Sequence, residues 1–132
     1  MKSILYVSVA DPELVSDDIY QLVGNAQQRN LADNISGIML YNGSNFLQLI
    51  EGGADIIDQC FARIVADPRH SGVITLRNEI CTVREFPLWA MRYSLVEQPV
   101  VTTLDSVRDA GAPRADTLDR IAAFVGLNRR GR

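Results

Sequence analysis

The sequence predicts an α+β fold of the ferredoxin-like type, in which a mixed five-stranded sheet carries two helices on one face. Two observations lead to this fold. Strand-like and helical segments follow one another in the order β-α-β-β-α-β-β. Each of the two helical segments has a single apolar stripe, so each helix needs one face of a sheet to cover. A chain of 132 residues, 47% of them hydrophobic, is long enough for one compact core.

The first strand and the first helix are marked by composition and by capping signals. Residues 3–9, "SILYVSV", are rich in β-branched and aromatic side chains, and Asp11-Pro12 ends the strand. A helix is expected to begin at Ser16, a residue type that caps helix N-termini well. The apolar stripe of this helix recurs every three or four residues and consists of Ile19, Leu22, Val23 and Ala26.

A hairpin and a second helix are expected next. Residues 35–41 and 45–50 have the composition of two strands, joined by the tight-turn signal Asn42-Gly43. A helix over residues 54–66 follows, and Pro68 stops it. Its apolar stripe consists of Ile57, Cys60, Phe61 and Ile64.

The last two strands of the sheet are predicted over residues 72–83 and 89–96. Two helices on one side leave the other face of the sheet bare. Residues 103–126 contain two further helical patterns, which either cover this bare face or dock on another subunit. The apolar stripe of the second pattern consists of Leu118, Ile121, Ala122 and Val125. We therefore expect two units, a domain over residues 1–97 and a C-terminal helical extension over residues 98–132.

Charge and cysteine usage limit the partners of the chain. The net charge of −3 and the isoelectric point near 5.0 argue against a nucleic-acid partner. The only basic cluster, Arg129, Arg130 and Arg132, is interpreted as a solvated end of the chain. No apolar run approaches the roughly 20 residues of a membrane span. The two cysteines have no metal-ligand spacing, which indicates a reduced, cytoplasmic protein.

Gln48 is the residue that stands out inside an otherwise apolar strand. Strand alternation places Phe46, Gln48 and Ile50 on one face, and a buried amide without partners costs about 1–3 kcal/mol. Tyr6 shares a face with Ile4 in the first strand, and its hydroxyl is a possible partner if the two strands are neighbours. The alternatives are an amide that is bonded to backbone, or a tyrosine–glutamine pair that only satisfies the core.

The other polar candidates have simple structural explanations by themselves. Asn30 lies at the end of the first helix, where asparagine is common for capping reasons. Arg63 and Asp67 stand four residues apart, as in a surface ion pair on one helix face. His70 is the only histidine, and no motif marks a nucleophile beside it. With no phosphate-binding glycine motif either, we expect no enzymatic activity.

Five stretches of the chain together resemble one protein family. They are "ILYVS", "QQRNLADNISGIMLY", "FLQLIEG", "FARIVADPRHSGV" and "FPLWAM", in this order. They resemble the BLUF family, the blue-light sensors that use flavin, and the resemblance covers residues 2–97. It implies that a flavin ring lies between the two helices, over one face of the sheet.

The resemblance also assigns roles to single residues. Gln48 matches the glutamine that bonds the N5/O4 edge of the flavin, and Tyr6 matches the tyrosine that bonds this glutamine and donates an electron. Trp89 and Met91 match the mobile pair of the last strand, which in the family lies next to the first strand, and Ser8 is expected to interact with this pair. The remaining residues expected around the cofactor are Asn30 at the imide edge, Arg63 near the C2 carbonyl, Asp67 near the ribityl chain, Leu22 and Ile64 on the two sides of the ring, and Phe46, His70 and Arg29.

The function implied by the resemblance is that of a blue-light photoreceptor. The cofactor is expected to be FAD, with FMN or riboflavin as alternatives. The signal is expected to pass through the last strand and the C-terminal helices to a downstream protein partner that the sequence does not identify, or to a second copy of the chain in a homo-oligomer. No nucleic acid or membrane is expected to take part. The alternative is a small ferredoxin-like ligand-binding module or enzyme without flavin photochemistry.

Overall fold

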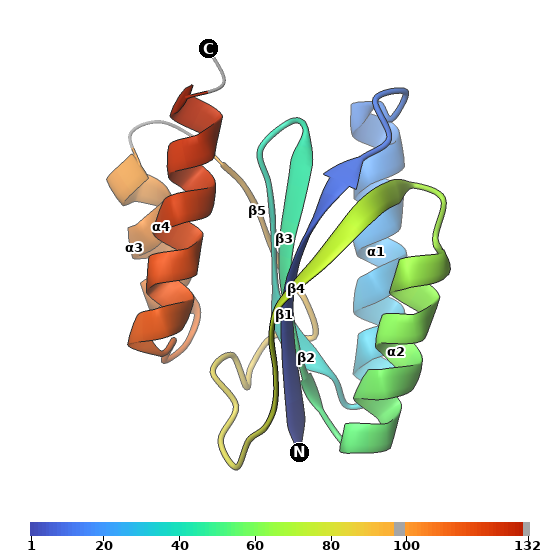
Figure 1. The fold of residues 1–132 in the computed structure, drawn as a ribbon. Helices are drawn as coiled ribbons and strands as arrows, with labels where there is room; N and C mark the ends of the chain where they lie inside the picture. The colour runs from blue at the N-terminus through green and yellow to red at the C-terminus, as the bar shows by residue number, and fades with distance from the viewer. Residues whose placement is uncertain (97–99, 131–132) are drawn as a thin grey trace.

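The computed structural model describes residues 1–96 and 100–130, so Arg132 and the expected domain boundary between residues 97 and 98 lie outside the described residues. The chain forms five strands and four helices within these ranges (Figure 1). In chain order they are β1 (Lys2–Ala10), α1 (Ser16–Ala32), β2 (Ser36–Tyr41), β3 (Asn45–Gly52), α2 (Ala54–Ala66), β4 (His70–Ile80), β5 (Arg92–Leu95), α3 (Val100–Ala110) and α4 (Ala115–Arg130).

The five strands form one mixed sheet in the order β4-β1-β3-β2-β5. β1 is antiparallel to both β3 and β4, β2 is antiparallel to β3, and β5 is parallel to β2. The predicted α+β fold with a mixed five-stranded sheet is confirmed. The expectation that the last strand lies next to the first is wrong, because β3 and β4 already occupy both edges of β1, and β5 pairs with the outer edge of β2.

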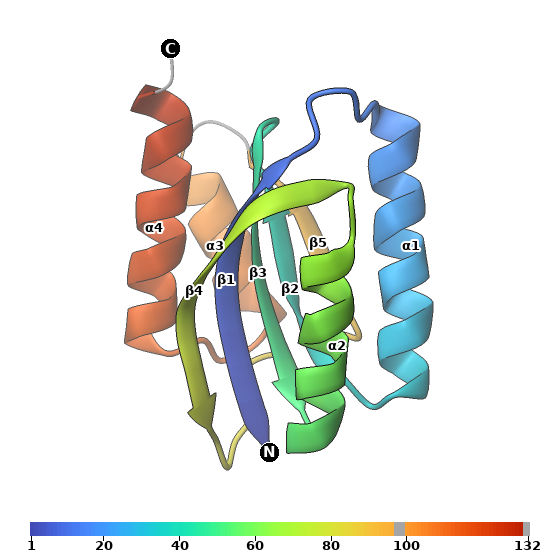
Figure 2. The same cartoon turned by 45° about the vertical axis from the view of Figure 1, so that its right-hand side comes forward.

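Helices cover both faces of the sheet, so the molecule has three layers (Figures 1 and 2). α1 and α2 lie on the face that receives Ile4, Tyr6 and Ile50. Their neighbours in sequence, Leu5 and Leu49, point to the opposite face and pack in a second cluster. The strict alternation along β1 and β3 therefore divides the core into two halves, as the period of two predicts.

The second half of the core is closed by α3 and α4. The apolar side chains that these helices bury against the sheet are Val107, Ala110, Ile121, Phe124 and Val125. The C-terminal segment thus covers the bare face, which was one of the two options open from the sequence. Phe124 was missing from the predicted stripe, whereas Ala122 of that stripe is only half-buried.

Several element boundaries differ from the predicted ones. β4 begins and ends earlier than the predicted range 72–83, and β5 begins at Arg92 instead of residue 89. Trp89 and Met91 therefore precede the last strand. The carbonyl of Trp89 makes one isolated bond, with the N–H of Gly37, before the regular pairing of β5 begins. α1 has Ser16 as its first helical residue instead of its cap, and the N–H of the preceding residue donates to the Asp18 carboxylate.

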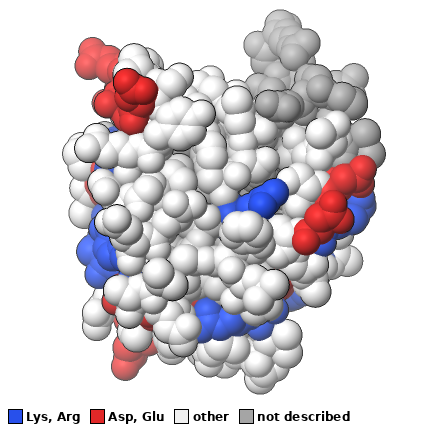
Figure 3. Space-filling view, turned by 180° about the vertical axis from the view of Figure 1, so that it is seen from behind, with Lys and Arg blue, Asp and Glu red and all other residues white. Residues whose placement is uncertain are grey.

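The surface shows no continuous basic area on the face seen from behind (Figure 3). Lysine and arginine side chains on this face form separate clusters that alternate with acidic ones. Among the described residues, no helix combines the length and the apolar character needed to cross a membrane. Cys60 and Cys81 are both free thiols.

Candidate functional site

Tyr6 and Gln48 form a hydrogen-bonded pair in the middle of the sheet. They are direct cross-strand neighbours in the β1–β3 register, and their side chains are 1% and 3% exposed. The Tyr6 hydroxyl donates to Oε1 of Gln48, and Nε2 of Gln48 lies 3.5 Å from the sulfur of Met91. In the described part of the chain the amide of Gln48 bonds to two side chains, so the alternative of an amide bonded to backbone is wrong.

The pair lies at the floor of a cleft between α1 and α2. The cleft holds about 590 Å³ of empty space, including the part that is open to solvent. The sequence-predicted site residues that line it are Tyr6, Leu22, Arg29, Asn30, Phe46, Gln48, Arg63, Ile64, Asp67 and His70. One face of the sheet and two helix stripes thus bring together residues that are up to 64 positions apart in the chain.

Four further residues line the cleft without having been singled out as site residues: Ala26, Met39, Cys60 and Arg69. Ala26 and Cys60 belong to the predicted helix stripes, each four residues from a predicted wall residue. Residues four apart share a helix face, so this spacing was enough to predict that both line the cleft. Met39 is the neighbour of Gln48 on β2, which follows once the hairpin register is known. Arg69 had no signal in the sequence.

Met91 and Trp89, although two residues apart, have different surroundings. Met91 is 2% exposed and contacts Gln48, whereas Trp89 is 38% exposed and lies outside the cleft. The Trp89 ring lies under the guanidinium of Arg92, 4.7 Å from ring centroid to carbon. The structure therefore places the methionine, and not the tryptophan, against the buried pair.

Ser8 contacts His70 instead of the Trp89–Met91 pair, so that expectation is wrong. Its hydroxyl lies 2.8 Å from Nδ1 of His70, and Nε2 of the same ring lies 2.5 Å from the carbonyl oxygen of Ile64. Since a carbonyl can only accept, Nε2 carries the hydrogen, and Nδ1 accepts from Ser8 in the neutral ring. His70 thereby ties α2 to β1 at one end of the cleft.

Asn30 is a buried tether and not a helix cap. The helix continues two residues beyond it, and its side chain is 3% exposed. Nδ2 of Asn30 donates to the carbonyl of Ala90 at 2.7 Å, and Nε2 of Gln27 donates to the carbonyl of Met91 at 3.0 Å. Two amides of α1 thus hold the two residues that come directly before β5.

The charged residues at the mouth of the cleft do not pair as the sequence suggested. Arg63 lies 3.5 Å from Asp33, and Asp67 lies 2.6 Å from Arg69, so the expected Arg63–Asp67 ion pair is absent from the described residues. Asp67 ends α2 in an extended conformation, which turns its carboxylate toward the following turn. Hydrogen bonds from Arg69 hold the pKa of Asp67 below its usual value.

Burial controls the proton of Tyr6. The pKa of its phenol is raised well above the ordinary value, mainly by desolvation and further by the nearby Cys60 and Asp67. The hydroxyl therefore keeps its proton at neutral pH and is the donor to Gln48. The site has a neutral hydrogen-bonded centre and a charged entrance.

The residues of the cleft fit a flavin. Leu22, Ala26 and Ile64 offer apolar contact to a flat ring, and Arg29 and Arg63 supply cations at the entrance. The amide nitrogen of Gln48 has two hydrogens, and its acceptor among the described residues is the weakly accepting sulfur of Met91. It can therefore donate to a stronger acceptor in the cleft. Neither feature is expected of an ordinary packed core.

A comparison with protein families supplies the deciding observation. The model of the family described as "BLUF: Sensors of blue-light using FAD" matches residues 1–92. The chain belongs to the BLUF family. The expected family is thereby confirmed, and the ligand-binding module or enzyme without flavin photochemistry finds no support.

Curated BLUF relatives are longer proteins that contain a similar region. The chain is 33% identical over 87 residues to the blue light- and temperature-regulated antirepressor BluF of Escherichia coli, a match over 65% of this chain and 21% of the relative. It is 33% identical over 110 residues to the photoactivated adenylate cyclase subunit alpha of Euglena gracilis, covering 79% of this chain and 11% of that protein. The chain thus spans about a tenth to a fifth of the length of these relatives.

Two solved structures of BLUF proteins are similar over nearly the whole chain. The dark-state structure of BlrB, a BLUF protein, matches with a TM-score of 0.76 and 32% identity over 95% of each chain. The Klebsiella pneumoniae BlrP1 structure with FMN and cyclic diGMP matches with a TM-score of 0.86 and 28% identity, over 95% of this chain and 34% of that one. Since α3 and α4 make up more than the unmatched 5%, the C-terminal helices belong largely to the shared fold.

Proposed function

We propose that this BLUF chain binds its flavin in the cleft between α1 and α2 and signals through the Tyr6–Gln48 pair. The observation that carries the proposal is the contact chain from the buried Tyr6 hydroxyl to Gln48 and on to Met91. It begins at the floor of a cleft suited to a flat ring and ends at the residue before the last strand.

Different residues of the cleft contact different parts of the cofactor. Leu22 and Ile64 contact the faces of the ring, while Gln48 and Asn30 bond its polar edges. The charged groups at the entrance, Arg29, Arg63 and Asp67, contact the more polar parts of the cofactor. Phe46 and His70 complete the lining of the cleft. We propose FAD as the cofactor, which is the flavin named for the family, and FMN as the alternative.

When bound, the flavin supplies absorption of blue light and, once excited, an acceptor for one electron. Tyr6 is the group best suited to give up that electron, since its proton already lies on a hydrogen bond to the oxygen of Gln48. An amide presents an oxygen and an NH₂ group of nearly the same shape, so half a turn of Gln48 reverses its hydrogen-bonding pattern without repacking.

Reversal of Gln48 has a direct consequence for Met91. In the present orientation the amide nitrogen donates to the sulfur of Met91. After reversal the amide oxygen faces this sulfur, and two acceptors then oppose one another. The contact is lost, and the segment before β5 shifts to a different balance of conformations.

We propose that the output is a change in association. β5 leads toward α3 and α4, and relatives of this chain join a similar region to other domains. The partner is a separate protein or a second copy of this chain in the cytoplasm, and the chain itself acts as a sensor and not as an enzyme.

An absorption spectrum of the purified protein before and after blue light tests the proposal. We expect a yellow protein whose flavin band shifts reversibly to longer wavelength. A colourless preparation that takes up no added flavin, or a bound flavin whose spectrum does not respond to light, would contradict the proposed function.

A further inference from the structure

Residues 84–91, called here the crossing segment, connect the two halves of the core. Phe86 is fully buried in the cluster under α3 and α4, whereas Met91 is buried in the cluster under α1 and α2. They are five positions apart in the chain, a span of at most about 18 Å when fully extended. A short segment therefore joins the Gln48 site to the C-terminal helices.

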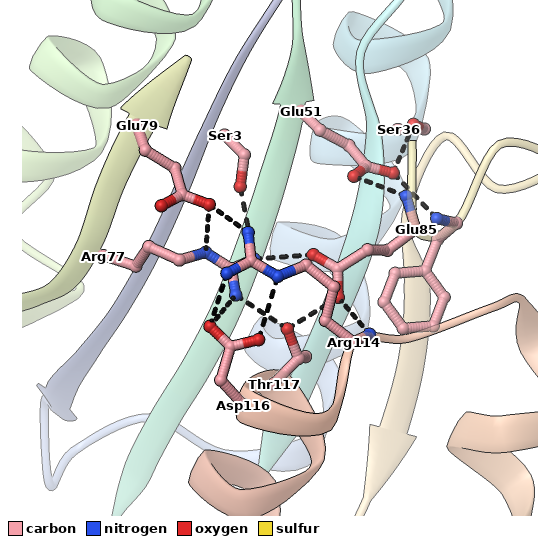
Figure 4. A network of polar contacts seen from close by, with 10 residues as sticks. Ser3, Ser36, Glu51, Arg77, Glu79, Glu85, Arg114, Asp116 and Thr117 are labelled. Carbon is pink, nitrogen blue, oxygen red and sulfur yellow. Dashed lines mark hydrogen bonds and ion pairs between the residues drawn. The ribbon is translucent and has the colours of Figure 1, made fainter. Parts of the chain in front are cut away.

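The first part of this segment is fixed to α4 through the carboxylate of Glu85 (Figure 4). Its Oε2 accepts from Nη2 of Arg77 at 2.6 Å, and its Oε1 accepts from the Thr117 hydroxyl at 2.6 Å. Oε1 also accepts from the backbone N–H of Arg114 at 2.8 Å. Glu85 is 5% exposed and Thr117 is fully buried, so water does not compete effectively for these bonds.

The turn between α3 and α4 is also fitted to the backbone of Glu85. The N–H of Ala112 donates to the Glu85 carbonyl at 2.8 Å. A Cβ atom at Gly111 would overlap this same carbonyl oxygen, so only glycine permits the close approach. The α3–α4 pair is therefore bonded to both the side chain and the main chain of Glu85.

The same part of the segment is bonded to the strand that carries Gln48. Glu51 of β3 is fully buried, and its two carboxylate oxygens accept from the backbone N–H groups of Glu85 and Phe86, both at 2.8 Å. The segment therefore has a strongly bonded beginning at Glu85. At its end, the side chain of Met91 meets Gln48 through a contact to sulfur. The carbonyls of Ala90 and Met91 accept hydrogen bonds from two amides of α1, so the main chain at this end is tied to that helix.

We propose that Glu85, held by Arg77 and Thr117, is a positioning residue of the light response, which fixes the crossing segment to α4 so that displacement of Met91 moves this helix. The inference rests on the proposed function of Gln48 and Met91. A segment that is free at its beginning would absorb the displacement by local rearrangement. A segment bonded to Thr117 and Arg114 transmits it to the first turn of α4.

Hydrogen exchange of the flavin-loaded, full-length protein, recorded in darkness and under blue light beside the absorption spectrum, tests this coupling. In the wild type we expect the spectral shift and a change in the exchange of α4 amides. Thr117→Val keeps the shape of the side chain and removes its hydroxyl. This variant should retain the spectral shift and lose the light-dependent change in α4, and in darkness its Glu85 and Phe86 amides should exchange about tenfold faster.

Thr117→Ser restores the hydroxyl and should restore the response of α4, which separates the hydrogen bond from mere packing. Asp105→Asn removes an acidic charge from an exposed ion pair on α3 and should leave the response unchanged. If Thr117→Val does not fold, Gly111→Ala, which displaces the turn from Glu85, is expected to have the same effect.

Two results would overturn the proposal. A spectral shift with an undiminished α4 response in Thr117→Val, or in Gly111→Ala, would overturn the role of Glu85 and leave the proposed function standing. Absence of a spectral shift in the flavin-loaded wild type would instead overturn the proposed function, and the inference with it.

Discussion

The two faces of the sheet bury polar groups of opposite kinds. On the α1–α2 face the buried centre is a neutral pair, Tyr6 and Gln48, with few partners. On the α3–α4 face it is a charged cluster in which Glu85 and Glu51 each accept three or more hydrogen bonds. A neutral amide can exchange its donor and acceptor ends at low cost, whereas a buried carboxylate with several donors has one favourable arrangement.

The neutral pair is therefore suited to act as a switch, whereas the charged cluster is suited to fix the fold. Hydrogen bonds to charged groups contribute roughly 1.5–3 kcal/mol, about twice the contribution of neutral ones. We therefore expect substitutions on the α1–α2 face to abolish the light response of a folded protein. Substitutions of the charged cluster should lower the free energy of unfolding.

The largest effect is expected for Gln48→Leu. Leucine has nearly the same size and neither donates nor accepts, so flavin should still bind through the other contacts while the reversible red shift is lost completely. Gln21→Leu, on the exposed surface of α1, is the matched control and should shift normally. Difference spectra before and after illumination measure both, and a normal shift in Gln48→Leu would place the switch elsewhere.

Tyr6→Phe should have almost the same effect for a different reason. The ring and its packing remain, but the hydroxyl that donates to Gln48 and the readily oxidised phenol are removed. The variant should bind flavin, form no shifted state, and show a longer flavin fluorescence lifetime. Tyr20→Phe changes an exposed tyrosine and serves as control. Unchanged photoconversion in Tyr6→Phe would assign the electron donor to another residue, with Trp89 as the next candidate.

On the other face, Arg77→Met is expected to destabilise the fold. It leaves the Glu85 carboxylate, whose side chain is 7% exposed, without its buried cation. Loss of one partner of a buried ion pair costs about 3–5 kcal/mol. Arg108→Met breaks an exposed pair with Asp105 and should change stability by less than about 0.5 kcal/mol. Urea denaturation measures the free energy of unfolding of both variants. If both lose equally little, the charged cluster does not hold the fold, and the distinction between the two faces fails.

The smallest effect is a difference in pH dependence between two acids. Bonds from Arg69 lower the pKa of Asp67, so its contribution to stability is present above its unfolded pKa of about 3.9 and is lost as pH falls through the folded value. Burial raises the pKa of Glu51, so its contribution is greatest below its unfolded pKa of about 4.3 and declines as pH rises through the folded value.

Urea midpoints measured between about pH 3 and pH 6 compare these contributions. The stability difference between wild type and Asp67→Asn should grow as pH rises. The difference between wild type and Glu51→Gln should shrink over the same range. The same pH trend in both variants would show that the two carboxyls are not in opposite environments.

The sequence by itself determined which residues share a face of the sheet. The period of two along a strand and the recurrence of apolar residues along a helix depend only on local backbone geometry. The residues that share a face with Tyr6 or with Gln48 within each strand, and both helix stripes, could therefore be identified. The family motifs then brought the cleft residues together, and ten of them do line one cleft. Local rules and the order of the family motifs along the chain suffice for these features.

Only the tertiary structure decided which elements are neighbours across the sheet edges. The position of β5 beside β2, the burial of Met91 with Trp89 left half-exposed, and the partner of Ser8 all depend on where the crossing segment runs. Glu51, Arg77 and Glu85 look in the sequence like ordinary solvated charges. They become buried partners because α3 and α4 close over them, and no local pattern specifies a contact between residues more than 30 positions apart.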